Sequence, residues 1–140
     1  MTSVQYSGGC LCGAIRYHAD VEPKFTFNCH CRDCQKSSGG AYAPLAFFAQ
    51  SQLSIQGDVK YYQSLGASGK IIQRGFCANC GSNLLGLPEL AAGLISIRAG
   101  TLDDPEMFQP KFEIFTSQAN EWDILNPDIQ HFEYGAEKKK

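Results

Sequence analysis

The sequence has no excess of basic residues, no long apolar run and no leader-like start. Its 12 Lys and Arg residues against 14 Asp and Glu give a formal net charge of −2, which does not favour binding to nucleic acid or to an anionic membrane. The longest apolar stretch, residues 41–49, is far shorter than the roughly 20 residues that cross a bilayer. Residues 1–9 lack the apolar core of a secretory signal. We therefore expect a protein of a reducing compartment, the cytoplasm, with no membrane or nucleic-acid partner.

Sustained helical periodicity and long repeats are also missing. Instead, apolar residues such as Ile15 and Tyr17 alternate with polar ones such as Arg16 and His18, and Gly, Ser, Pro or Asp separate the pieces. Strands are expected at residues 15–19, 25–27, 42–48, 53–56, 59–62, 70–76, 95–97 and 111–115, and short helices at 32–37 and 88–92. The length of 140 residues then predicts one mainly β domain over residues 1–136 and a basic tail at 137–140.

Seven cysteines are present, in three closely spaced groups: Cys10 and Cys12; Cys29, Cys31 and Cys34; Cys77 and Cys80. Two thiolates one or two residues apart can bind one zinc ion from a tight turn, and a glycine follows both the first and the last pair. We therefore expect Cys10, Cys12, Cys77 and Cys80 to form a closed, structural four-thiolate zinc site. Random burial of small side chains does not explain this spacing, and an odd count in a reducing compartment disfavours a disulfide framework.

The middle group offers only three sulfurs. Zinc with three protein ligands keeps one position for water or substrate, so Cys29, Cys31 and Cys34 predict a second, working zinc ion and hence two zinc ions per chain. The alternative is a second structural zinc completed by His30, His18 or His131. In an extended segment the side chain of His30 faces away from the two flanking sulfurs, which argues against His30 as that ligand.

Three motifs carry a family resemblance: Gly-Cys-Leu-Cys-Gly at 9–13, Cys-His-Cys-Arg-Asp-Cys at 29–34 and Arg-Gly-Phe-Cys-Ala-Asn-Cys-Gly-Ser at 74–82. With them the sequence resembles the glutathione-dependent formaldehyde-activating family, which also includes the centromere protein V-like proteins. The resemblance implies an Mss4-like zinc-binding fold of small stacked antiparallel sheets with few short helices. It also implies the same division of the seven cysteines between a structural zinc and a second, activity-linked zinc.

The family name refers to the condensation of glutathione with formaldehyde to S-hydroxymethylglutathione, formally a carbon–sulfur lyase reaction. The resemblance therefore implies a zinc-dependent carbon–sulfur lyase that acts on glutathione, or another small thiol, and an aldehyde adduct. In that function Cys29, Cys31 and Cys34 would be catalytic through their bound zinc. The alternative is a non-catalytic, zinc-stabilised binding module, as the centromere-protein branch suggests.

Charge also favours thiol chemistry, because three thiolates leave a zinc site at −1, which acidifies water poorly but suits a further soft sulfur ligand. Arg32, Lys36 and Arg74 are candidates for binding the carboxylates of a peptide-like thiol. Further donors are expected from Ser37, Ser38, Gly39 and Gly40. His30 is expected near the metal or at the surface, and the alternative is that it relays a proton. Core packing is expected of six aromatic residues: Phe47, Phe48, Tyr61, Tyr62, Phe76 and Trp122.

Overall fold

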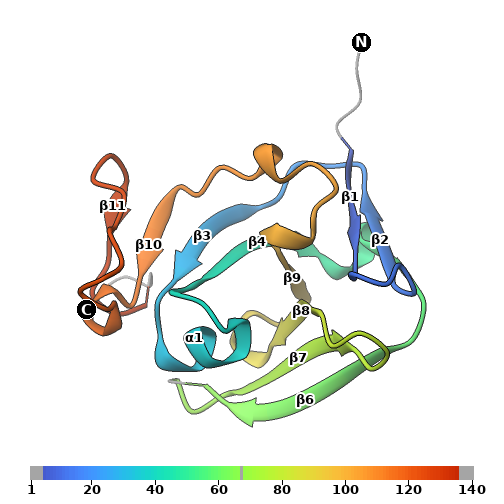
Figure 1. Cartoon of the computed structure of the whole chain (residues 1–140), viewed down its shortest axis with the longest axis horizontal. Coiled ribbons are helices and arrows are strands. Elements are labelled where there is room, and N and C mark those ends of the chain that lie inside the picture. The colour runs from blue at the N-terminus through green and yellow to red at the C-terminus, as the bar shows by residue number, and fades with distance from the viewer. Residues whose placement is uncertain (1–4, 67, 136–140) are drawn as a thin grey trace.

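The computed structural model describes residues 5–66 and 68–135, which form two β-sheets and one short α-helix (Figure 1). The expected basic tail at 137–140 lies outside the described residues. The smaller sheet has three antiparallel strands in the order β1 (Tyr6–Gly9), β2 (Arg16–Ala19) and β5 (Ser54–Gln56). The larger sheet has eight strands in the order β11 (Gln130–His131), β10 (Phe112–Ile114), β3 (Phe25–Cys29), β4 (Ala43–Ala49), β9 (Leu94–Arg98), β8 (Asn83–Pro88), β7 (Ile71–Cys77) and β6 (Val59–Leu65).

The pairing in the larger sheet changes at one edge. In the sheet order β3, β4, β9, β8, β7 and β6, all neighbouring strands are antiparallel. Strand β10, in contrast, runs parallel to both β3 and β11. Parallel neighbours need a long crossover, and the chain between β3 and β10 supplies it by forming most of the sheet first. The expectation of a mainly β fold is confirmed, and the parallel edge adds to it.

Most helices and strands lie where the sequence predicted them, with a few differences. Helix α1 (Arg32–Ser38) occupies the expected position after the middle cysteines. The second expected helix is a single 3-10 turn, Glu89–Ala91, because Pro88 ends strand β8. Strands β1, β8 and β11 were not expected: glycines interrupt the apolar pattern of β1 and β8, and β11 is only two residues long. Further 3-10 turns lie at Gln50–Gln52, Ala99–Thr101, Pro105–Met107 and Thr116–Gln118.

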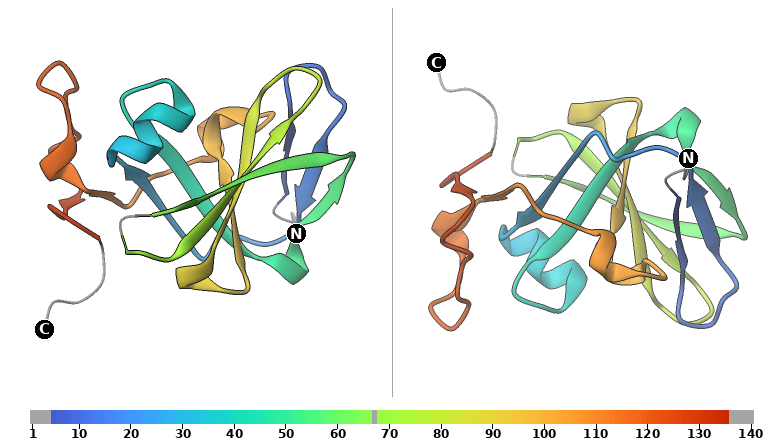
Figure 2. Two further views of the ribbon diagram at one scale, coloured as in Figure 1. Left: turned by 90° about the horizontal axis from the view of Figure 1, so that it is seen from below. Right: turned by 90° about the horizontal axis from the view of Figure 1, so that it is seen from above.

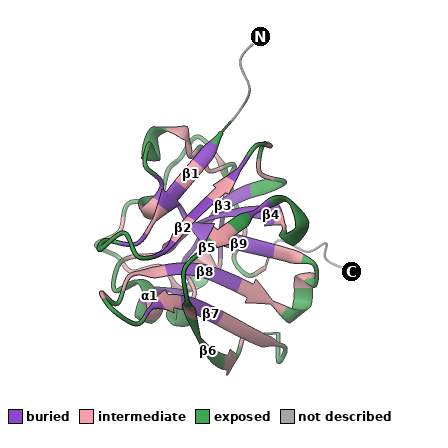
Figure 3. Ribbon diagram, turned by 90° about the vertical axis from the view of Figure 1, so that its right-hand side faces the viewer, coloured by how far each residue is buried: buried purple, intermediate pink, exposed green. Residues whose placement is uncertain are grey.

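Both faces of the central strands β3, β4 and β9 are covered, so the core has two layers. Figure 3 shows buried residues along the central strands of the larger sheet, whereas the edge strand β6 has none. One face packs against the smaller sheet through side chains such as Tyr17, Phe48 and Ile97. The other face is covered by α1 and the C-terminal segment. It buries a second group of apolar side chains, which includes Phe27, Leu45 and two of the middle cysteines. Figure 2 shows the smaller sheet and the C-terminal segment at opposite ends of the molecule.

Three of the six aromatic residues expected in the core are exposed instead. Tyr61, Tyr62 and Trp122 are 39%, 66% and 71% exposed, whereas Phe47 and Phe48 are buried and Phe76 is half-buried. The two tyrosines lie on β6, which is an edge strand of the sheet and therefore has a partner on one side only.

Among the described residues, no helix is long and apolar enough to cross a membrane.

The two-layer core generates a stability prediction with a matched control. Leu85 is fully buried on β8, opposite Ile97 of β9, whereas Leu90 is 60% exposed. We expect Leu85→Ala to lower the free energy of unfolding by about 2–5 kcal/mol, because it removes buried methyl groups and leaves a cavity. Leu90→Ala should change it by less than about 0.5 kcal/mol. Urea unfolding of both variants measures the difference, and equal effects would contradict the assignment of this core.

Candidate functional site

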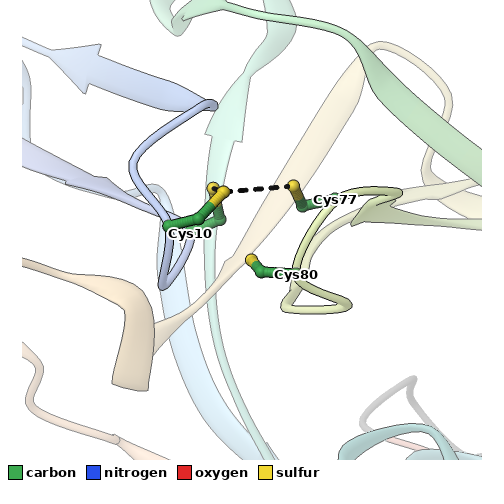
Figure 4. Close-up of side chains that lie close together, drawn as sticks. Cys10, Cys77 and Cys80 are labelled. Atoms are coloured by element: carbon green, nitrogen blue, oxygen red, sulfur yellow. Dashed lines mark hydrogen bonds between the residues drawn. The ribbon is translucent and has the colours of Figure 1, made fainter.

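The first and last cysteine pairs meet where the two sheets come together. Cys10 and Cys12 lie in the turn between β1 and β2, and Cys77 and Cys80 lie at the end of β7 and in the turn before β8. Their four sulfurs lie within 4.8 Å of one another. The Sγ atoms of Cys10 and Cys12 are 3.6 Å apart, and those of Cys12 and Cys77 are 3.8 Å apart (Figure 4). Residues that are 65 positions apart in the sequence thus form one cluster.

The two turns have matching backbone geometry. Gly13 and Gly81 have φ angles of 83° and 82°, in the left-handed region that glycine adopts without strain. Their N–H groups donate to the carbonyl oxygens of Cys10 and Cys77, at 3.0 and 2.7 Å. Each turn therefore curls its two sulfurs toward the same point. The tight turns expected at both pairs are therefore present.

Polar groups of the turns are directed at the sulfurs. The backbone N–H of Ile15 donates to Cys10 Sγ at 3.2 Å, and the side-chain amide of Asn79 donates to Cys12 Sγ at the same distance. The hydroxyl of Ser82 lies 3.2 Å from Cys80 Sγ and accepts a hydrogen bond from the backbone of Leu11 at 2.9 Å. The hydroxyl and backbone N–H of Ser82 lower the pKa of Cys80 to about 5. These donors stabilise thiolates, the form that binds metal.

The four sulfurs fit a tetrahedral ion. At a zinc–sulfur distance of about 2.3 Å, the sulfurs of a regular tetrahedron are about 3.8 Å apart. The separations of 3.6 and 3.8 Å match this value. The all-sulfur donor set further favours zinc over hard cations such as magnesium, which prefer oxygen ligands.

The middle cysteines form a second cluster, at the junction of β3 and α1. Cys29 ends β3, Cys31 caps the N-terminus of α1, and Cys34 lies in its first turn. The three sulfurs lie within 4.8 Å of one another, and the backbone N–H of Cys34 donates to Cys31 Sγ at 3.4 Å. Among the described residues, no His, Asp or Glu side chain joins this group. The donor set again suits zinc, with three protein ligands.

The histidines considered as a fourth ligand have other partners. His18 contacts Asp20 and Ser7 at the smaller sheet, and His131 contacts the backbone oxygen of Asn126 at 2.8 Å. His30 faces away from the sulfurs, as the alternation of an extended segment indicates. The alternative of a histidine-completed second site is therefore not supported by the geometry.

His30 is not a surface residue, and its surroundings could not be read from the sequence. Its side chain is fully buried, with Nε2 2.5 Å from Glu113 and Nδ1 3.1 Å from Asp123. The Tyr42 ring lies against the imidazole at 5.1 Å between centroids. The carboxylates come from β10 and from the segment after it, more than 80 residues along the chain. This arrangement holds the cysteine loop against the C-terminal part of the protein.

The pKa values of Cys29 and Cys31 shift in opposite directions. Hydrogen bonds from the Cys29 and Cys34 thiols, the backbone N–H of Cys34 and the charge of Arg74 lower the pKa of Cys31. The same contact with Cys31 raises the pKa of Cys29. A cation bound between the sulfurs would offset the repulsion between neighbouring thiolates, so all three cysteines could be deprotonated at once.

A cavity of about 220 Å³ lies beside Arg74, whose charge acts on Cys31 of the second cluster. It is lined by residues of α1, β6, β7, β8 and the turn before β8: Ser37, Tyr62, Arg74, Phe76, Gly81 and Asn83. Ser37 lies three positions after Cys34, and Gly81 directly follows Cys80, so residues close in sequence to both clusters line the cavity, although no cysteine does. Asn83 donates to the carbonyl oxygen of Ser37 at 2.8 Å, and its own Oδ1 is buried without a partner among the described residues.

Of the three basic residues expected to meet a ligand, the structure brings only Arg74 to the cavity. The Arg32 guanidinium donates to the side chain of Gln35, the backbone N–H of Arg32 donates to Gln118 Oε1, and Lys36 is exposed on α1. The hydroxyl of Ser38 donates to the backbone of Tyr42, which leaves Ser37 as the serine that lines the cavity. Gly39 and Gly40 follow at the exposed end of α1.

Arg98 is a buried charge that the sequence analysis did not single out. It is 7% exposed at the end of β9, and burial lowers its pKa, whereas the charges of Cys34 and Cys29 oppose that shift. The alternation of residues 95–98 indicated a polar face. Because both faces of β9 are covered, that face is buried too.

Comparisons with known proteins agree with this picture. A crystal structure of a Rhodobacter sphaeroides protein has the same fold, with a TM-score of 0.55, 17% sequence identity and coverage of 89% of this chain and 98% of that one. An uncharacterized lyase of Schizosaccharomyces pombe is 31% identical over 80 residues, which are 57% of this chain and 56% of that protein. The match thus spans about half the length of this relative.

The family comparison covers most of the chain. The family model described as glutathione-dependent formaldehyde-activating enzyme matches residues 5–118, a range that contains all seven cysteines and every residue lining the cavity. Two clusters of sulfurs able to hold metal ions, arranged on a mainly β fold, accompany this match. The chain belongs to the glutathione-dependent formaldehyde-activating enzyme family.

Proposed function

We propose that the protein is a zinc-dependent carbon–sulfur lyase that acts on glutathione, or another small thiol, and an aldehyde adduct such as S-hydroxymethylglutathione. The observation that carries the proposal is the cluster of Cys29, Cys31 and Cys34, which has three sulfurs and a neighbouring cavity. The family match and the lyase name of the yeast relative support the reaction class. Seven free thiols suit a reducing compartment, and we propose the cytoplasm.

The two sulfur clusters would have different tasks. Cys10, Cys12, Cys77 and Cys80 offer four sulfurs, the number of a closed tetrahedral site, and would hold a structural zinc. Cys29, Cys31 and Cys34 would hold a second zinc, which supplies a free position for a thiol sulfur and favours its thiolate form. We therefore propose two zinc ions per chain.

The cavity would orient the reactants. Arg74 places positive charge beside the sulfurs, and the buried Oδ1 of Asn83 offers an acceptor to a ligand N–H or O–H. In the synthetic direction a carbon–sulfur bond forms as the carbonyl π bond of the aldehyde breaks, and the thiol proton ends on the new hydroxyl oxygen. No oxidant or reductant is required. The protein contributes nucleophile activation and proximity.

His30 does not serve as the proton relay. Its ring is fully buried, and both nitrogens face carboxylates. No nitrogen is therefore left for a substrate proton. The role of His30 is to hold the segment that carries Cys29 and Cys31.

Removal of a sulfur from the first cluster should unfold the protein. Structural zinc in small domains contributes roughly 10 kcal/mol or more to folding, which is comparable to the whole stability of a domain. We expect Cys77→Ser to give insoluble or unfolded protein, as judged by circular dichroism and thermal melting. A folded variant with the melting temperature of the parent protein would contradict the structural assignment.

Removal of a sulfur from the second cluster should leave the fold intact. Residues 29–34 are held by β3, α1 and the contacts of His30, so their position does not depend on a bound ion. We expect Cys31→Ser to contain one zinc ion instead of two and to lose lyase activity, as measured by mass spectrometry and product formation. Cys77→Ser is the matched comparison. If both variants unfold alike, the second zinc is structural and the enzyme proposal fails.

The ligand can be tested by blocking its sulfur. We expect glutathione to bind in calorimetry and S-methylglutathione to bind at least tenfold more weakly, because its sulfur cannot become a thiolate. Binding should also disappear in Cys31→Ser. Equal binding of the two peptides would show that recognition does not use the sulfur, and a non-catalytic binding module would then be the better description.

A further inference from the structure

Two buried arginines share one face of the larger sheet with the middle cysteines. Arg98 pairs with Leu45 of β4, and Leu45 also pairs with Phe27, two residues before Cys29 on β3. Because cross-strand partners and alternate residues lie on the same face, Arg98 and Cys29 face the same side of the sheet. This is the side that α1 covers with Cys34.

The same face continues to Arg74. Ser96 lies two residues before Arg98 on β9 and pairs with Gly86 of β8, which in turn pairs with Arg74 of β7. A Cβ atom at Gly86 would lie 2.6 Å from Ser96 Oγ and 3.2 Å from Arg98 Nη1. The missing side chain thus leaves the space in which the Arg98 guanidinium lies. Arg74 is the residue of this row that reaches the cavity.

Neither guanidinium has a carboxylate partner among the described residues. Arg98 and Arg74 are 7% and 8% exposed and donate to Ser96 and Ser64 hydroxyls, at 3.2 and 3.1 Å. The Nε atom of each is buried without a hydrogen-bond partner in the part of the chain that the structure describes. A buried charge without a counter-charge is costly, so two such charges on one face require negative charge nearby.

The sulfur cluster supplies that negative charge. Three thiolates and one divalent cation sum to −1, and the two arginines add +2, which leaves the face at +1. A ligand that arrives as an anion brings the sum to zero, whereas a neutral ligand leaves it positive. The charge balance of this face therefore discriminates between ligands by their charge.

We propose that Arg98 and Arg74 are the fixed counter-charges of the three-cysteine centre, and that Arg74 selects a ligand whose sulfur is anionic. The choice of a thiol as the ligand rests on the proposed function, whereas the role of Arg98 does not. Both are positioning residues, because they act on the sulfurs through charge and form no bond to the reacting atoms.

Metal affinity tests the role of Arg98. We expect Arg98→Met to weaken the binding of the second zinc ion at least tenfold in competition with a chelator, while the first ion is unaffected. Arg98→Lys keeps the charge and should retain most of the affinity. Lys60→Met, which removes an exposed positive charge on β6, is the control and should behave like the parent protein. Equal losses in the Met and Lys variants, or no loss in either, would overturn the proposal.

Thiol binding tests the role of Arg74 and remains available if Arg98→Met does not fold. The probes are glutathione and 2-mercaptoethanol, whose sulfur is the atom that can become an anion. We expect Arg74→Met to keep both zinc ions and to bind both probes about tenfold more weakly. Arg74→Lys should recover the affinity for both probes. Weaker binding of glutathione alone would show that Arg74 binds a carboxylate. Unchanged binding of both probes would show that Arg74 acts on neither the carboxylate nor the sulfur. Either result overturns the proposed selection.

Failure of the proposed function gives a different pattern. If the parent protein binds neither probe but Arg98→Met still loses the second zinc, the centre is charge-balanced without being a thiol site. If the parent protein binds both probes and the arginine variants do so equally well, the thiol function stands and the role of the arginines falls.

Discussion

The contact between two cysteine turns joins the two sheets, and the position of the candidate site depends on it. The turn after β1 belongs to the smaller sheet, and the turn after β7 belongs to the larger one. Their sulfurs lie within 4.8 Å, and Ser82 adds a hydrogen bond from one turn to the other. Gly81 of the second turn also lines the cavity. A shift of the second turn, which carries Cys80 and Gly81, would therefore change both the sulfur cluster and the shape of the cavity.

The two clusters are built in opposite ways. The four-sulfur cluster unites distant segments, so its geometry depends on the tertiary fold. The three-sulfur cluster comes from residues 29–34, and its shape is set by the end of β3 and the first turn of α1. Contacts of His30 with Glu113 and Asp123 then hold this short segment to the rest of the protein. A site whose shape is set locally can exchange a ligand without disturbing the core.

The sequence predicted the features that depend on short spacing. Cysteines two or three positions apart predicted both clusters, a glycine after the first and the last pair supported the four-sulfur cluster, and alternation predicted most strands. Strand β8 was missed because Gly86 and Pro88 interrupt its pattern, although Gly86 is there to make room for Arg98. The alternation on β9 predicted a strand, but it did not predict that the polar residues Ser96 and Arg98 would be buried as well. The partners of His30 lie more than 80 residues away, and no local pattern identifies such a pair.

The long separation within the four-sulfur cluster affects how the protein is made. Cys12 and Cys77 are 65 positions apart, and a ribosome that adds about 5–20 residues per second needs roughly 3–13 s to cover that distance. During this interval the first cysteine pair is already part of the nascent chain, whereas the second pair has not yet been synthesised. The middle cysteines are synthesised in between and need no later sulfur. The nascent chain therefore encounters cellular metal and oxidants with its local cluster complete and its cross-linking cluster half made.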